Sequence, residues 1–182
     1  MSPATLAEPA VLPEEALYEI VNGQKVELPP MGVRSTWIAS ALFGFLFPHV
    51  QRHRLGHHVM EMLFILDRAA NMRRRPDVAF VSAERWPLDR ETPWEGDWDV
   101  VPDLAIEVVS PNDTFSAVER KVGEYFDHSV RQVWVVSPVE QRVYVYDSPE
   151  DVRIVAVSAE LESPLLPGWR LPLATLFRTP TS

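Results

Sequence analysis

Residues 104–109 read LAIEVV, a short run of apolar and mostly branched residues that is interrupted by one carboxylate, Glu107. Residues 77–81 read DVAFV and have the same character, with Asp77 at their start. Short continuous apolar runs are typical of strands that are covered on both faces of a sheet. We therefore expect these two segments to be interior strands of an α/β domain.

The chain before Asp77 predicts a hairpin and then a helix. Asn22-Gly23 tolerates the positive φ angles of a two-residue hairpin turn. The strand-like runs on either side of this turn are residues 17–21 and 25–28. A helix is expected to begin with Ser35 or Thr36 as its cap and to continue to about Leu55. Pro48 is expected to kink this helix or to end its first part.

The chain after Glu107 predicts a second helix and further strands. Ser116-Ala-Val-Glu119 has the form of a capping box, and apolar residues at helical spacing continue to about His128. Other strand-like runs are residues 58–66, 132–136, 142–146 and 152–157. This order of elements predicts an α/β sheet with helices on both faces. Residues 1–13 predict a flexible arm, and residues 14–182 a single domain.

The composition excludes several classes of site. The 182 residues are 46% apolar and include no cysteine, so a disulfide framework, a thiolate zinc site and a cysteine nucleophile are all excluded. Any metal must be held by oxygen or imidazole ligands. The longest uncharged apolar run, Trp37 to Phe47, is about half of the roughly 20 residues that span a bilayer. We expect a cytoplasmic protein that does not enter a membrane.

The charge balance argues against a surface that binds nucleic acid everywhere. The 26 acidic residues outnumber the 17 basic ones and give a net charge of −9, the wrong sign for such a surface. Only Lys25 and Lys121 among the basic residues are lysines. Because arginine is so strongly preferred in this chain, a position that holds lysine instead suggests a need for an ammonium group.

Glu107 and Asp77 are candidates for metal ligands. A carboxylate in a buried strand is costly unless it is paired or coordinates a metal. Ala79, next to Asp77 on the same strand face, is small enough to leave room for an ion. Alternatively, Glu107 lies at a sheet edge or pairs with arginine, and Asp77 only ends a strand or pairs with the arginines before it. Asp103 shares a face with Glu107 but lies ~13 Å away along the strand, so we expect it to order the neighbouring loop as an auxiliary residue.

Lys121 is the candidate for the third functional group. It falls in the second turn of the second predicted helix, and a helix that crosses back over a sheet can direct a long side chain toward the strand before it. The alternative is a surface ion pair with Glu124. Two carboxylates and one ammonium form the set that metal-dependent phosphodiester hydrolysis needs. The carboxylates would hold Mg²⁺ or Mn²⁺, and the ammonium would orient the water or stabilise negative charge.

The ordered segments around these residues resemble a known family. They are RPDVAFV with Asp77, PDLAIEVVSP with Glu107, ERKVGEYF with Lys121, and then VWVVSP and VYVYD. Together they are similar to the Uma-type restriction endonucleases of the PD-(D/E)XK nuclease superfamily. The resemblance implies a restriction-endonuclease-like core, a mixed β-sheet flanked by α-helices, with the metal at Asp77 and Glu107. Val109 stands where the superfamily places lysine, and the family resemblance implies that Lys121 takes that role.

Further residues extend the predicted site. Glu19 and Glu27, in the predicted hairpin, resemble the additional N-terminal acid that some of these nucleases use, although either could face solvent. Arg73, Arg74 and Arg75 could receive a DNA phosphate, and the alternative is a solvated turn that balances an acidic chain.

The sequence therefore predicts a Mg²⁺- or Mn²⁺-dependent endonuclease that hydrolyses phosphodiester bonds in DNA. One alternative is a nuclease-like fold that no longer cuts and serves as a binding or regulatory module, which the acidic composition and Val109 favour. Another is a hydrolase of smaller phosphorylated substrates. The aromatic content is compatible with a homodimer.

Overall fold

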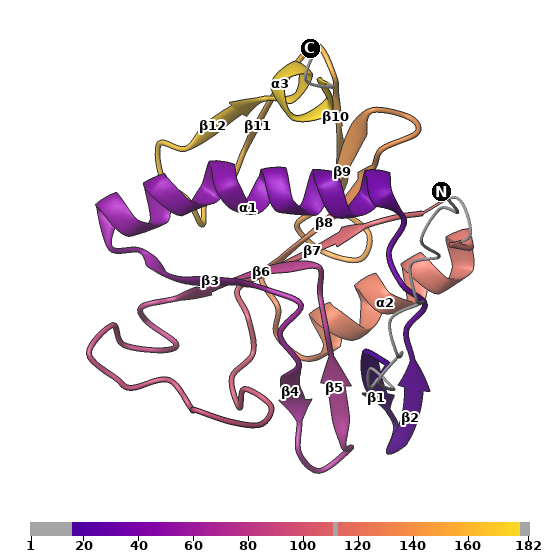
Figure 1. Ribbon diagram of the computed structural model, residues 1–182, viewed down its shortest axis with the longest axis vertical. Coiled ribbons are helices and arrows are strands. Elements are labelled where there is room, and N and C mark those ends of the chain that lie inside the picture. The colour runs from indigo at the N-terminus through magenta and orange to yellow at the C-terminus, as the bar shows by residue number, and fades with distance from the viewer. Residues whose placement is uncertain (1–15, 111–112, 179–182) are drawn as a thin grey trace, which may run out of the picture.

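A six-stranded sheet forms the centre of the protein in the computed structural model, which describes residues 16–110 and 113–178 (Figure 1). The strand order is β10-β9-β8-β7-β6-β3. The strands are β3 (Gly56–Met60), β6 (Val78–Ser82), β7 (Leu104–Val108), β8 (Gln132–Ser137), β9 (Arg142–Tyr146) and β10 (Val152–Ala156). The β7–β8 pair is parallel, and the other neighbouring pairs in this sheet are antiparallel. The expected mixed sheet is confirmed, while the predicted arm at residues 1–13 lies outside the described residues.

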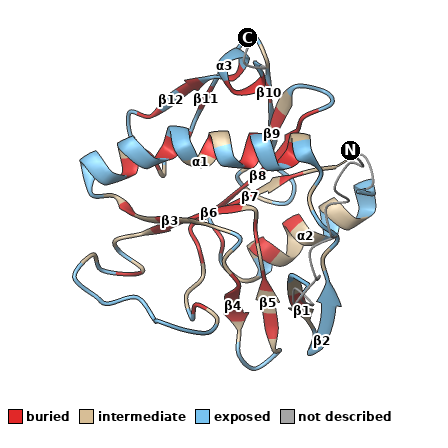
Figure 2. Cartoon of the chain, in the orientation of Figure 1, coloured by how far each residue is buried: buried red, intermediate tan, exposed pale blue. Residues whose placement is uncertain are grey.

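Two helices cover opposite faces of this sheet, α1 (Val33–His53) and α2 (Phe115–Asp127) (Figure 1). Side chains of a strand alternate between its faces, and the strands are apolar on both. In β7, Leu104 and Ile106 belong to the core beneath α1, whereas Ala105 belongs to the core beneath α2. Figure 2 shows the resulting band of buried strand residues between the helices. The same alternation places Glu107 on the α2 face.

A four-stranded sheet lies on the α2 side, in the order β2-β1-β5-β4 (Figure 1). Its strands are β1 (Tyr18–Val21), β2 (Gln24–Glu27), β4 (Phe64–Asp67) and β5 (Met72–Arg74). The predicted hairpin is confirmed, with φ of 50° at Asn22 and 78° at Gly23. The single strand expected over residues 58–66 is wrong. The left-handed φ of 50° at Glu61 turns the chain, so that β3 and β4 join different sheets.

The helix boundaries correct the two predicted caps and show that Pro48 does not end α1. Helix α1 begins after Gly32 without a side-chain cap, and the Thr36 hydroxyl instead donates back to the Gly32 carbonyl at 3.1 Å. Pro48 lies inside α1, which continues to His53. Helix α2 is capped by Thr114, whose Oγ1 accepts from the Ala117 N–H at 3.3 Å, and not by the Ser116 capping box. Thr114 has the extended φ and ψ that a cap requires.

The C-terminal segment packs on the α1 side. It comprises β11 (Glu160–Glu162), β12 (Arg170–Pro172) and α3 (Leu173–Phe177). Leu161, Leu171 and Leu176 join the core beneath α1, so this helix lies between the large sheet and the C-terminal segment (Figure 1). Among the described residues, no helix combines the length and apolar character needed to span a membrane.

Candidate active site

Strand pairing brings Asp77 and Glu107 together on the α2 face. Val78 in β6 lies opposite Ile106 in β7, and continuing this register by one residue places Asp77 opposite Glu107. Side chains directly opposite one another in an antiparallel pair have Cβ atoms about 4.5–5.5 Å apart. The Val108 N–H donates to Asp77 Oδ2 at 2.6 Å, which holds this carboxylate at the end of β7.

Lys121 reaches the same point from helix α2. Its Nζ donates to Glu107 Oε2 at 2.8 Å and lies 3.1 Å from Glu19 Oε1. The alternative pair with Glu124 does not form, because Glu124 is paired with Arg74. The helix thus directs its lysine back to the strand that precedes it.

Tyr125 completes the contacts of Glu107, a role that the sequence pattern did not predict. Its hydroxyl donates to Glu107 Oε1 at 2.6 Å, so both oxygens of Glu107 accept hydrogen bonds. Burial, the charge of Glu107 and that of Glu19 raise the pKa of Tyr125 well above its ordinary value, and the phenol therefore remains a donor. One signal for this role was present in the sequence: Tyr125 lies four residues after Lys121, on the same face of the helix.

Glu19 and Arg74 extend these contacts into a buried ion network. Glu19 is buried, pairs with Lys121 and Arg74, and accepts from the Arg75 N–H at 2.9 Å. Burial alone would raise the pKa of Glu19, but the ammonium and guanidinium groups outweigh burial and lower it. Arg74 also pairs with Glu124 on α2. Through its two ion pairs, Arg74 links Glu19 of the N-terminal hairpin to the helix.

The cluster as a whole carries an excess of negative charge. Its members are Glu19, Asp77, Glu107, Glu124, Arg74 and Lys121. With every carboxylate ionised, four negative charges face two positive ones and leave a formal charge of −2. Burial and the charge of Glu107 together raise the pKa of Asp77 to about 7. Burial also raises the pKa of Glu107, against the opposing charge of Lys121.

These features fit a divalent cation held by oxygen atoms. One such ion would neutralise the formal charge of the cluster, and Asp77 and Glu107 offer the hard carboxylate oxygens that Mg²⁺ prefers. In residues 16–110 and 113–178, no group of three or more His, Cys, Asp or Glu side chains is arranged to hold a metal alone. Mg²⁺ is commonly bound by one or two carboxylates together with water and substrate phosphate, so two carboxylates suffice.

Lys121 is unsuited to act as a base in this site. Burial alone would lower the pKa of its ammonium, but the carboxylates of Glu107 and Glu19 outweigh burial and raise it above the ordinary lysine range. The side chain therefore stays protonated at neutral pH. It can donate hydrogen bonds and stabilise negative charge, but it cannot abstract a proton from water.

The carboxylates of Asp77 and Glu107 line a cavity of about 130 Å³. Asp77, Glu107, Lys121, Arg75 and Glu61 are among the residues that line it. The role of Glu61 was missed at the sequence level, because this residue falls inside a segment that was expected to be one continuous strand. Its backbone N–H donates to the Asp77 carbonyl at 3.2 Å, and its charge contributes to the raised pKa of Asp77.

The remaining predicted residues do not line this cavity. Glu27 is exposed on β2, and Asp103 is fully buried away from the cavity, where it pairs with the loop residue Arg85 at 3.1 Å. The guanidinium groups of Arg73 and Arg74 are paired with carboxylates, Arg73 with Asp97. The predicted phosphate role of these two arginines is therefore not supported.

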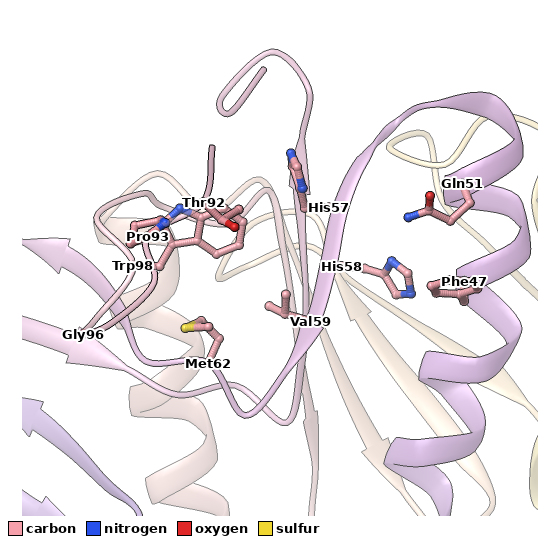
Figure 3. Close-up of a pocket in the computed structure, with 10 residues that line it drawn as sticks. All are labelled: Phe47, Gln51, His57, His58, Val59, Met62, Thr92, Pro93, Gly96 and Trp98. Carbon is pink, nitrogen blue, oxygen red and sulfur yellow. The ribbon is translucent and has the colours of Figure 1, made fainter. Parts of the chain in front are cut away.

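Another cavity, of about 230 Å³, lies at the β3 edge of the large sheet (Figure 3). Phe47, His58, Met62 and Trp98 are among its lining residues, and no described residue that lines it is a carboxylate. Its chemistry is aromatic and imidazole-rich, which does not suit a hard cation. The cavity beside Asp77 and Glu107 is therefore the better candidate for an active site.

Asp77→Asn is expected to stabilise the metal-free protein at pH 8. The folded-state pKa of about 7 lies above the unfolded value. Stability therefore falls as pH rises from the unfolded pKa to the folded one, because in that window the unfolded carboxyl has lost its proton while the folded one still holds it. Each pKa unit corresponds to about 1.4 kcal/mol, and the expected gain is therefore a few kcal/mol. Urea unfolding with a chelator would measure it. The gain should vanish near pH 4, and an equal gain at both pH values would contradict this explanation.

The chain resembles known proteins both in sequence and in fold. A family model described as "Putative restriction endonuclease" (Uma2) matches residues 6–174. The chain is also similar to a solved structure from Anabaena variabilis that is described as a putative nuclease belonging to DUF820. The TM-score is 0.78 at 21% identity, over 91% of this chain and 93% of that one, a likeness that shows the fold. A search of curated proteins gave no significant match.

Proposed function

Because the chain belongs to the Uma2 family of putative restriction endonucleases, we propose that it is a Mg²⁺- or Mn²⁺-dependent nuclease that hydrolyses phosphodiester bonds in DNA. The observation that carries this proposal is the opposed pair of Asp77 and Glu107 in a cluster with a formal charge of −2. Ionised carboxylates that are held this close are costly without a cation. A homodimer and a cytoplasmic location remain predictions.

The protein groups would divide the chemistry among them. Asp77 and Glu107 would hold the ion, which when bound supplies Lewis acidity toward the phosphate and toward a water molecule. Lys121 is within hydrogen-bonding distance of Glu107 and remains cationic, so it can stabilise the negative charge that develops on the phosphate. Tyr125 keeps Glu107 in one orientation through its hydroxyl.

A titration of the wild-type protein with Mn²⁺ tests the metal site. We expect binding at pH 8 that weakens about tenfold at pH 6, because a proton competes for Asp77 below its pKa of about 7. Calorimetry at the two pH values measures the ratio. Binding that is equal at both pH values would exclude Asp77 as a ligand.

Incubation with DNA and with nucleotides tests the reaction. Turnover of DNA in Mg²⁺ or Mn²⁺, lost on addition of a chelator, is the expected result. Turnover of nucleotides alone would point to a hydrolase of small phosphorylated substrates. A protein that binds DNA but neither binds Mn²⁺ nor cuts would be a nuclease-like binding module, the alternative that Val109 in place of the superfamily lysine favours.

A further inference from the structure

The active-site cavity is the first of three neighbouring cavities along helix α2, which together we call the groove. A cavity of about 100 Å³ shares Glu107, Asp113 and Lys121 with the active-site cavity. A third, of about 280 Å³, shares Val109, Val118 and Val135 with the second. The three cavities therefore follow one another from Asp77 and Glu107 to strand β9.

Strand register places an aromatic ring in line with the catalytic carboxylate. Glu107 in β7 lies opposite Val135 in β8, and Val135 lies opposite Tyr144 in β9. Residues that are opposite one another project from the same face of a sheet. Two strand spacings of about 4.8 Å separate Glu107 from Tyr144, or about 10 Å.

Three aromatic side chains line the far end of this groove. Tyr144 and Tyr146 are half-buried and project from the same face of β9, because they are two residues apart. Phe115, in the first turn of α2, is 74% exposed although it is a large apolar residue. The Tyr144 hydroxyl donates to Glu140 Oε2 at 2.6 Å, which holds the ring in place. We name this set, Phe115, Tyr144 and Tyr146, the aromatic shelf.

We propose that the aromatic shelf stacks on an unpaired base next to the scissile phosphate, so that the substrate of the proposed nuclease is single-stranded nucleic acid. This inference rests on the function proposed above, since the phosphate is placed at Asp77 and Glu107. Bases expose their faces to aromatic side chains only where they are unpaired and unstacked. The short separation of Glu107 and Tyr144 suits a base that neighbours the reacting phosphate.

The charges of the protein favour base stacking over ionic contacts with the phosphates of the nucleic acid. The net charge is −9, and the guanidinium groups of Arg73 and Arg74 are paired with carboxylates. Lys121 and Arg75 are the cations that line the active-site cavity among the described residues. Base stacking does not require positive charge, so it can supply affinity that the phosphate contacts of this protein cannot.

Fluorescence anisotropy with a labelled single-stranded oligonucleotide tests the shelf, with Ca²⁺ present to limit cleavage. We expect the single strand to bind more tightly than a duplex of the same sequence. Phe115→Ala and Tyr144→Ala should each weaken single-strand binding by about 5- to 150-fold. With two phosphate contacts, the slope of log affinity against log salt should be about −1.4.

Trp37→Ala provides the matched control. Trp37 is an aromatic residue of α1 that is 46% exposed and lies away from the groove, so its loss should leave binding unchanged. Phe115 is largely exposed, and its truncation should not impair folding even if that of Tyr144 does. Equal binding of single strand and duplex, or unchanged affinity in Phe115→Ala, would overturn the proposal, as would the absence of oligonucleotide binding.

Cleavage assays separate this proposal from the function on which it rests. If the wild type cuts DNA and the KM for a single strand rises in Phe115→Ala while kcat is retained, both proposals are supported. Cleavage with an unchanged KM in Phe115→Ala would contradict the shelf alone. If oligonucleotide binding depends on the aromatic shelf but the protein neither binds Mn²⁺ nor cuts DNA, the proposed nuclease function is contradicted and the shelf remains a binding site.

Discussion

Glu107→Gln is expected to abolish Mn²⁺ binding and to slow phosphodiester hydrolysis by at least about 10³-fold. The substitution keeps the shape of the side chain and removes one of the two proposed anionic ligands. A neutral amide is a poor ligand for a hard divalent ion beside a single remaining carboxylate. The lost Lewis acidity is worth several kcal/mol of transition-state stabilisation, and each 1.36 kcal/mol is a factor of about ten in rate.

The Glu107→Gln protein should remain folded, so the loss can be assigned to the site. Lys121 keeps Glu19 as an ionic partner at 3.1 Å, and the amide oxygen of the substituted side chain can still accept from the Tyr125 hydroxyl. The substitution also lowers the excess negative charge of the cluster. Circular dichroism and thermal unfolding would confirm folding before calorimetry and cleavage are measured.

Glu27→Gln is the control for this experiment. Glu27 is an exposed glutamate of β2 that does not line the active-site cavity, so its substitution should change neither Mn²⁺ binding nor the rate. Retention of full metal affinity and turnover in Glu107→Gln would contradict the assignment of the site. A loss in both variants would show that the effect is not local.

Lys121→Met is expected to destabilise the protein by about 3–5 kcal/mol and to abolish activity. Methionine preserves most of the side-chain volume but removes the cation that Glu107 and Glu19 share. The Lys121 side chain is only 20% exposed, and that of Glu19 only 2%. Water therefore cannot replace the lost charge. Since ordinary domains are stable by only about 5–15 kcal/mol, urea unfolding should show a large shift.

Two further variants separate charge from packing. Lys25→Met replaces the other lysine, which lies exposed on β2 above the Tyr18 ring at 4.5 Å, and it should cost less than about 1 kcal/mol. Adding Glu19→Gln to Lys121→Met should restore part of the lost stability, because it removes one of the unpaired carboxylates. A double variant that is no more stable than Lys121→Met would show that the loss comes from packing.

The local pattern of the chain was enough to predict the central strands and their carboxylates. Glu107 stands out because it interrupts an apolar run and Asp77 because it begins one, and a charge in a buried strand is costly without a partner. Asn22-Gly23 predicted the hairpin for a similarly local reason, since few residues tolerate positive φ. Lys121 stood out through the scarcity of lysine in an arginine-rich chain.

Contacts between distant residues decided the remainder of the site. Whether Glu19 or Glu27 joins the buried ion network depends on how the hairpin packs against β5 and α2, and only Glu19 is buried. Whether Arg74 could receive a phosphate depends on Glu19 and Glu124, which lie 55 and 50 residues away in sequence. No local pattern contains that information.

The amino-acid sequence alone determined which segments are interior strands and which residues bring charge into them, because alternation and desolvation act over a few neighbouring residues. The tertiary structure decided the partners of those charges. Pairing of β6 with β7 opposes Asp77 to Glu107, the turn at Glu61 adds a further acid, and α2 contributes Lys121 and Tyr125. Register and helix docking are set by the packing of the whole core, and a carboxylate acquires its pKa only once those neighbours are in place.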